Sequence, residues 1–351
     1  MKKGTERLME IASALLAVLA VACVAVRLPA GFSRNTAVAA AGFILPCGAA
    51  EGYHSADEED DTISSPGSSG KSSGSLSSRR QSSASEASRG SSVPSGTGST
   101  ENGVQEMCIN TGGSKYEDFY VKNSNQHHSV DIGAELSKRP DIKIQKNAGP
   151  QVLIYHTHTT EAFSGVTRTT DKTKSVCAVG DAIAKQLEAA GIGVLHDTTY
   201  HDYPAYNGSY QRSIVTMRKD LKAHPSIQVT IDLHRDAMTR TDGTRLKPTA
   251  VVNGKKTAQV MVISGCDDTG DLGFPDWEYN LRFALRLQKS MADLYPNFAR
   301  PLNFCARRYN ENVTHGSLLV EIGTDANTLD EAVYGGELFG KALAATLSQL
   351  T

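Results

Sequence analysis

The sequence predicts an α/β fold, a single three-layer αβα domain with a mostly parallel sheet, over residues 150–351. Two observations support this. From about Pro150 onward, apolar runs alternate with amphipathic stretches of helical period, which is typical of strands and helices in alternation. The first of these runs, Gln151–Tyr155, reads as a buried strand, as expected for a sheet covered on both faces.

The first elements of the domain form one strand–helix–strand unit. After the strand Gln151–Tyr155, the stretch Val176–Ala190 has helical periodicity, and Gly191 marks its end. Ile192–Leu195 is then expected to be a short strand. This order favours parallel strands joined by a crossover helix.

The second half of the domain repeats this alternation. A helix is expected over Tyr210–Ala223, because Pro225 prevents its continuation, and the strand Ile227–Leu233 follows with His234 just past its end. The remaining predicted elements are strands near Lys247–Val252 and Ala258–Ser264, a helix near Tyr279–Leu294, a strand over Ser317–Ile322 and a final helix over Leu329–Leu350.

The N-terminus predicts a membrane anchor over residues 1–27. Three basic residues precede the mostly apolar run Leu8–Val26, which Arg27 closes, and this run is about long enough to cross a hydrocarbon core of ~30 Å. The alternative is a cleaved signal peptide, with Ala37–Ala40 as the cleavage region. Both interpretations place the rest of the chain outside the cytoplasmic membrane, and the first predicts a single-pass protein.

Residues 28–149 are interpreted as a linker between the anchor and the catalytic domain. Its centre, about Ser55–Gly103, is rich in Ser, Gly and charged residues and has almost no large apolar side chains, so it cannot bury enough surface to fold. A flexible coil of ~50 residues spans ~40 Å on average. We therefore expect a tether, with an incidental disordered insertion as the alternative.

Charge and cysteine spacing exclude two classes of site. The formal net charge is -2, which gives no basic footprint for a phosphate backbone, so we expect no nucleic-acid partner. The six cysteines include no Cys-x-x-Cys pair, so no cysteine zinc site is indicated. A disulfide outside the membrane is compatible with the sequence, as are buried free thiols.

Three polar signals fall at strand ends, where open α/β sheets place their ligands. They are His156–Glu161 after the first strand, His234–Asp236 after the strand ending at Leu233, and Glu321 near the end of the last strand. Two imidazoles and a carboxylate are a common ligand set for catalytic zinc, and a further glutamate acts as general base. The sequence thus predicts a hydrolytic Zn²⁺ site.

Other readings of these residues are open. Glu321 taken alone fits a buried ion pair with Arg235 or Arg307. His201 lies on an expected loop, where we expect it to border the cleft and bind substrate, with a side chain that simply faces water as the alternative. A serine or cysteine hydrolase is disfavoured because the folded region has no Gly-x-Ser-x-Gly sequence and Cys177 falls within a predicted helix.

Several spaced motifs together resemble the stage II sporulation protein P family. They are Val152–Glu161, Val179–Asp181, His196–Asp197, Asp232–Ala237, Leu319–Gly323 and Asn327–Thr328. The resemblance implies a zinc-dependent N-acetylmuramoyl-L-alanine amidase with a fold similar to that of the zinc-dependent cell-wall amidases. It also implies a role in septal peptidoglycan degradation and engulfment, at the sporulation septum and with the stage II sporulation proteins D and M.

The resemblance also suggests roles for individual residues. His234 matches the second histidine ligand of the amidases and Glu321 their catalytic glutamate. His158 is expected to be the first ligand, with His156 as the alternative. Glu161 is the expected carboxylate ligand.

Two further assignments remain open at this point. Asp171, just ahead of the helix in which the wider amidase group carries its ligand, is the rival of Glu161. Arg235 stands where that group has small residues, and its guanidinium fork suggests binding of a substrate carboxylate. A cross-link endopeptidase using the same residues, or a non-catalytic wall-binding scaffold, are the alternative functions.

Overall fold

The computed structural model describes residues 100–101 and 103–351. The predicted anchor, residues 1–27, and nearly all of the Ser/Gly-rich centre of the linker lie outside this part of the chain and stay predictions, as does the alternative of cleavage. Within the described ranges, no helix is both long and apolar enough to cross a membrane.

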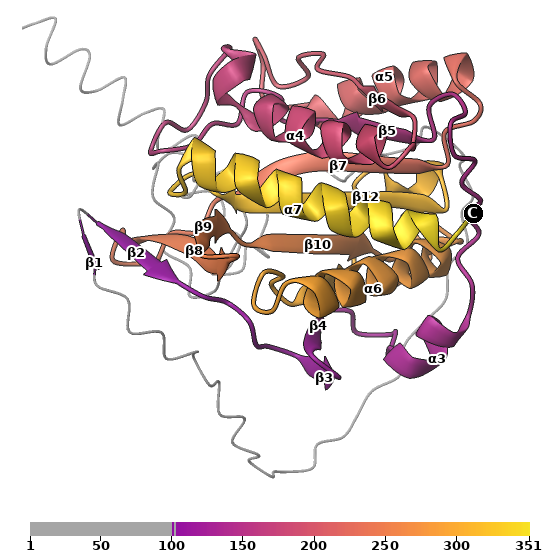
Figure 1. Ribbon diagram of the computed structural model, residues 1–351, viewed down its shortest axis with the longest axis horizontal. Helices are drawn as coiled ribbons and strands as arrows, with labels where there is room; N and C mark the ends of the chain where they lie inside the picture. Colours follow the sequence, from indigo (N-terminus) through magenta and orange to yellow (C-terminus); the bar gives the residue numbers. More distant parts are fainter. Residues whose placement is uncertain (1–99, 102) are drawn as a thin grey trace, which may run out of the picture. The chain divides into compact units, whose positions relative to one another are not determined.

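The centre of the domain is an eight-stranded sheet (Figure 1). In spatial order its strands are β3 (Ser114–Tyr116), β4 (Phe119–Asn123), β11 (Leu302–Cys305), β10 (Val260–Gly265), β12 (Gly316–Thr324), β7 (Val229–Asp236), β5 (Val152–Tyr155) and β6 (Val194–His196). Every residue of β7 and of β12 is buried. These two strands therefore form the middle of the domain.

The prediction of a mostly parallel sheet is wrong, because the central sheet is mixed. Strand β10 runs antiparallel to β12, and β3 runs antiparallel to β4. A parallel return needs a crossover, usually a helix, but the chain between β7 and β10 forms the strands β8 (Arg245–Val252) and β9 (Lys255–Ala258) instead. Without a crossover helix, β10 enters the sheet in the opposite direction.

A smaller four-stranded sheet has the order β1 (Thr100–Glu101), β2 (Val104–Met107), β8, β9. Strands β8 and β9 form a hairpin around Asn253 and Gly254, both with positive φ, as a tight two-residue hairpin turn requires. Thr324, at the end of β12, donates a hydrogen bond from Oγ1 to the Leu246 carbonyl at 2.8 Å. This contact ties the small sheet to the central one.

Helices cover both faces of the central sheet. On one face lie α4 (Val176–Ala189), α7 (Leu329–Ser348) and α6 (Trp277–Leu294), seen together in Figure 1. On the opposite face, Met217 of α5 (Ser209–Ala223) packs against Leu153 and Tyr155 of β5. A short helix, α3 (Ile132–Ser137), contacts α6.

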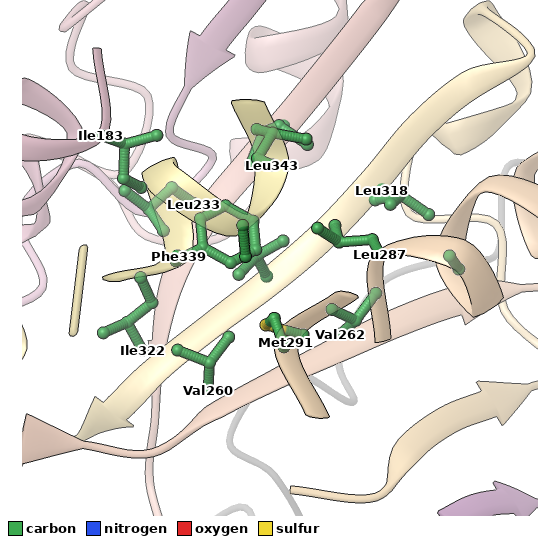
Figure 2. Close-up of a cluster of buried hydrophobic side chains, with 14 of the residues drawn as sticks. Ile183, Leu233, Val260, Val262, Leu287, Met291, Leu318, Ile322, Phe339 and Leu343 are labelled. Atoms are coloured by element: carbon green, nitrogen blue, oxygen red, sulfur yellow. The ribbon is translucent and has the colours of Figure 1, made fainter. Parts of the chain in front are cut away.

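The main hydrophobic core fills the space under α4, α6 and α7. Figure 2 shows Phe339 and Leu343 of α7 among the apolar side chains of the sheet, close to Leu233 of β7. Successive side chains of a strand point to opposite faces. Because Leu233 faces this core, His234 points to the other face of the sheet.

The predicted elements from Gln151 to the C-terminus are present, with small shifts at their ends. Ser175 caps α4 by accepting from the Cys177 amide, and Gly191 follows the helix with φ 76°. His234, expected just past its strand, lies within β7. The strands β9 and β11 were not predicted.

Part of the segment assigned to the linker is folded. Residues 104–137 contribute β2, β3, β4 and α3, and the chain continues in contact with the sheet up to β5. Their apolar residues are interrupted by polar residues and glycines and show no clear period, so no helix or strand is predicted here. The described domain therefore includes residues well before Pro150.

Candidate metal centre and active site

The loop after β5 and strand β7 bring His158, Glu161 and His234 together. The Nδ1 of His158 lies 3.5 Å from Oε1 of Glu161, and the Nδ1 of His234 lies 3.7 Å from Oε2 of the same carboxylate. The two imidazole rings are 5.0 Å apart and meet edge to face. All three side chains are buried, so this group is a candidate site for a metal ion.

Glu321 lies beside this group on the neighbouring strand. It stands opposite His234 in the parallel pairing of β12 with β7, and opposite Met261 in the antiparallel pairing of β12 with β10. Side chains in register on adjacent strands share one face of a sheet. Glu321 and His234 therefore point to the same face, away from the main hydrophobic core, and Glu321 is fully buried.

Asp232 holds His234 from the side away from Glu161. Its Oδ1 lies 2.9 Å from the Nε2 of His234, and its two oxygens also accept hydrogen bonds from the amide and hydroxyl of Thr157, at 2.8 and 2.6 Å. Metal-binding histidines commonly use their second ring nitrogen in this way. The contact leaves the Nδ1 of His234 directed toward Glu161.

The pKa values of Glu161 and His234 depend on each other's charge. Burial alone would raise the pKa of Glu161, but the positive charges of His234 and Arg235 outweigh it and hold that pKa well below its usual range. Burial would lower the pKa of His234, but Asp232 and Glu161 raise it well above its ordinary value. The two carboxylates thus stabilise the protonated form of His234, whose Nδ1 proton a metal ion bound beside Glu161 would replace.

The donor set fits zinc. Ligand atoms about 2.0–2.2 Å from a tetrahedral Zn²⁺ lie roughly 3.3 Å from one another. The two separations measured from the Glu161 oxygens, 3.5 and 3.7 Å, are close to this spacing. Two imidazoles and one carboxylate also leave a fourth position for water. Of the alternatives left open by the sequence, this geometry favours His158 over His156 and Glu161 over Asp171.

His156 belongs to a different cluster. Its Nδ1 is 2.8 Å from the Leu233 carbonyl and its Nε2 is 2.9 Å from the Nε2 of His196, whose Nδ1 lies 2.9 Å from Asp181. A Cβ atom at Gly180 would lie 2.4 Å from that His196 nitrogen. Within the motif Val179–Asp181, Gly180 thus leaves the space that the contact between His156 and His196 requires.

Asp171 and His201 are also placed away from the candidate metal ligands. Asp171 is partly exposed, caps a short turn and pairs with Lys174 at 3.1 Å. His201 is buried, with Nδ1 2.7 Å from the His156 carbonyl and Nε2 2.8 Å from the Thr216 hydroxyl. Both ring nitrogens of His201 therefore contact the protein, which does not favour a substrate-binding role.

Arg235 forms hydrogen bonds to Glu161 and to the loop that carries it. Its backbone amide donates to Oε2 of Glu161 at 2.9 Å, while its buried guanidinium donates to the carbonyls of Ala162 and Thr167 at 3.0 and 2.7 Å. This geometry favours a role in positioning the Glu161 loop over the expected contact with a substrate carboxylate.

Two tyrosines and one aspartate near the candidate metal centre are not among the site residues predicted from the sequence. Tyr206 stacks on His158 with ring centroids 4.5 Å apart, and Tyr210 contacts the same ring edge to face at 5.8 Å. Neither tyrosine can be recognised as a site residue from the sequence, because tyrosines are common in loops and at helix starts. Asp232 could have been found, since it stands two residues before His234 and must share its face of the strand.

The described residues thus define an α/β protein with a buried His/Glu/His group. The sequence profile of the stage II sporulation protein P family matches residues 55–344, and the chain belongs to that family. A relative, the stage II sporulation protein P of Bacillus subtilis (strain 168), is 29% identical over 198 residues. The match covers 51% of this chain and 47% of the relative, so the chain spans about half the length of that protein.

Several solved structures of N-acetylmuramoyl-L-alanine amidases are similar to this chain. AmiC2 of Nostoc punctiforme has a TM-score of 0.34 and 13% identity, covering 57% of this chain and 98% of its own. Ami1 from Mycobacterium smegmatis has a TM-score of 0.34 and 14% identity, covering 59% of this chain and 98% of its own.

Proposed function

We propose that the chain is a zinc-dependent hydrolase that cleaves the amide bond between N-acetylmuramic acid and L-alanine in peptidoglycan. The observation that carries this proposal is the buried group of His158, Glu161 and His234 with Glu321 in register beside it. A ligand set for a catalytic metal and a separate carboxylate for proton transfer are the two parts that metal-assisted amide hydrolysis requires.

In this proposal, His158, Glu161 and His234 hold Zn²⁺, which when bound lowers the pKa of water and polarises a carbonyl group. Glu321 takes the proton of the attacking water and then delivers it to the nitrogen of L-alanine, which leaves as an amine. Asp232 keeps the His234 ring in one orientation throughout.

The cellular setting is part of the proposal. Membership of the sporulation family supports action on septal peptidoglycan during engulfment, with the stage II sporulation proteins D and M as partners. The basic and apolar N-terminal sequence supports a membrane-anchored protein whose catalytic domain lies outside the cytoplasmic membrane.

The test combines elemental analysis with digestion of purified peptidoglycan by the full chain. We expect about one zinc per chain, and mass analysis that finds free stem peptides together with unsubstituted muramic acid. A cross-link endopeptidase would instead leave the stem peptides attached to the glycan, and a wall-binding scaffold would release nothing.

Two variants assign the reaction to the site. Glu321→Gln should retain zinc and lose peptide release, whereas Glu188→Gln, the same change at an exposed position of α4, should behave as the wild type. Full activity of Glu321→Gln would overturn the assignment of the general base.

A further inference from the structure

A cavity of about 570 Å³ lies on the same face of the sheet as the candidate metal centre. Its walls come from β10, β11 and the start of the segment after β11, together with residues of the N-terminal segment around β2 and β4. Three methionines, Met107, Met238 and Met261, line part of it. The cavity is thus a concave surface lined by residues that are far apart in the sequence.

The cavity begins next to the reacting groups. Asp236, which lines it, follows His234 by two residues in β7, and Met261 stands opposite Glu321 across the β10–β12 pair. Alternate residues of a strand share one face. A substrate held in the cavity would therefore lie on the same face of the sheet as His234 and Glu321 and next to both.

The charges that line the cavity are mostly positive. Arg300 is buried and its Nη1 lies 2.8 Å from Oδ2 of Asp236, so these two charges offset each other. Lys122 and Arg307 also line the cavity, and among the described residues neither side chain forms an ion pair. Two positive charges are therefore left uncompensated.

The buried arginine also has hydrogen-bonding capacity left. Among the described residues, no group accepts a hydrogen bond from the Nε of Arg300, although a buried donor without a partner is unfavourable. A guanidinium fixed on one side by Asp236 is oriented in advance, which suits the recognition of a planar anion.

We propose that this cavity binds the peptide part of the substrate and that Lys122 and Arg307, beside Arg300, recognise its free carboxylates. The inference rests on the proposed function and names the subsite for the leaving peptide. A stem peptide carries carboxylates and apolar side chains, which match the cations and the flexible methionine wall. A glycan strand presents hydroxyl and acetamido groups, for which the two uncompensated cations offer no charge complement.

The test measures binding of a free stem peptide, a product of the proposed reaction, to the full chain by calorimetry. The peptide is used with its carboxylates free and with all of them amidated. The variants are Lys122→Gln, Arg307→Gln and the double variant, which spare the buried pair of Arg300. Lys185→Gln is the matched control, because Lys185 is exposed on α4, across the sheet from the cavity.

We expect the double variant to bind the free peptide at least about tenfold more weakly than the wild type, since each lost charge-assisted hydrogen bond is worth about tenfold or more. Amidation should weaken binding to the wild type by a similar factor, and Lys185→Gln should change nothing. Equal affinity of the double variant and the wild type, or of the free and amidated peptides, would overturn the inference.

Peptidoglycan digestion separates this inference from the proposed function. If the wild type releases stem peptides and the double variant does so with unchanged kcat/KM, the cavity assignment fails and the amidase proposal stands. If the wild type cleaves a different bond but its peptide affinity still depends on Lys122 and Arg307, the amidase proposal fails and the cavity assignment stands.

Discussion

The Nε2 of His234 lies 2.9 Å from Oδ1 of Asp232, the residue two places earlier in the same strand. Because Asp232 also accepts two hydrogen bonds from Thr157, its carboxylate is fixed on both sides. A ligand whose far nitrogen is held in this way keeps one ring orientation and is a better base toward a metal. Strand β7 thus carries both the candidate ligand His234 and the carboxylate that orients it.

Asp232→Asn should therefore weaken zinc binding by about 10–100-fold, the usual effect of losing a carboxylate behind a histidine ligand. Zinc affinity is measured by competition with a chelator at fixed pH, with thermal unfolding recorded in parallel. Asp171→Asn is the control, because Asp171 is a partly exposed turn residue away from the group. An Asp232→Asn protein that is folded and has wild-type zinc affinity would show that the contact has no such role.

The position of the candidate site could be predicted because its residues follow simple strand geometry. His158 and Glu161 come directly after a buried strand, and Glu321 is an acidic residue within an apolar one. The sequence did not separate His156 from His158, since both follow β5. Their roles depend on α4, where Gly180 leaves room for His196 to meet His156.

Other features depend on contacts between distant parts of the chain. The direction of β10 follows from the hairpin of β8 and β9, which replaces a crossover helix. The cavity could not be predicted because Lys122 and Arg307 are far apart in sequence and lie in stretches without a clear period. Local patterns describe single elements, whereas these features arise from how the elements pair.

Gly180→Ala should destabilise the domain, because the new Cβ would lie 2.4 Å from the Nε2 of His196. Forcing extra volume into a packed site costs about 1–3 kcal/mol. Denaturant unfolding measures the effect. In the double variant Gly180→Ala, His196→Ala the clash is removed, so the two changes should be non-additive. Strict additivity of the two unfolding free energies would contradict the proposed steric cause.

The stability of the protein should depend on pH through His156. Burial, and then the nearby charge of His196, lower the pKa of His156 to about 3. In the unfolded chain its pKa is about 6.5. Between these two values the unfolded state binds a proton that the folded state does not, so stability falls as the pH falls below about 6.5, by up to about 1.4 kcal/mol per pH unit.

His156→Asn is the variant that isolates this effect, because an asparagine amide can replace the Nδ1–H that faces the Leu233 carbonyl. The unfolding free energies of the two proteins should converge, or change order, as the pH is lowered from 7 to 5. A difference that stays constant over this range would mean that the pKa of His156 is the same in the folded and unfolded protein.

A second pH effect reports on the docking of α3. Burial would raise the pKa of Glu135, but hydrogen bonds from Lys138 and Arg282 outweigh it, so the net pKa is lowered. A carboxylate with a lowered folded pKa stabilises the fold above its unfolded pKa of about 4.3 and loses this contribution as the pH falls through the folded value. The stability advantage of the wild type over Glu135→Gln should therefore be present at pH 6 and disappear in acid. An advantage that persists in acid would point to a cause other than charge.

Breaking the buried ion pair of Arg300 and Asp236 should lower the free energy of unfolding, because it leaves a buried charge without a partner. Arg300→Met leaves the Asp236 carboxylate buried without its partner 2.8 Å away, and breaking such a pair costs about 3–5 kcal/mol. The double variant Arg300→Met, Asp236→Asn removes the second charge as well and should recover part of the loss. Denaturant unfolding of the wild type, both single variants and the double variant gives the coupling energy directly. If the double variant is less stable than Arg300→Met alone, the loss arises from packing at the two sites and not from the uncompensated charge.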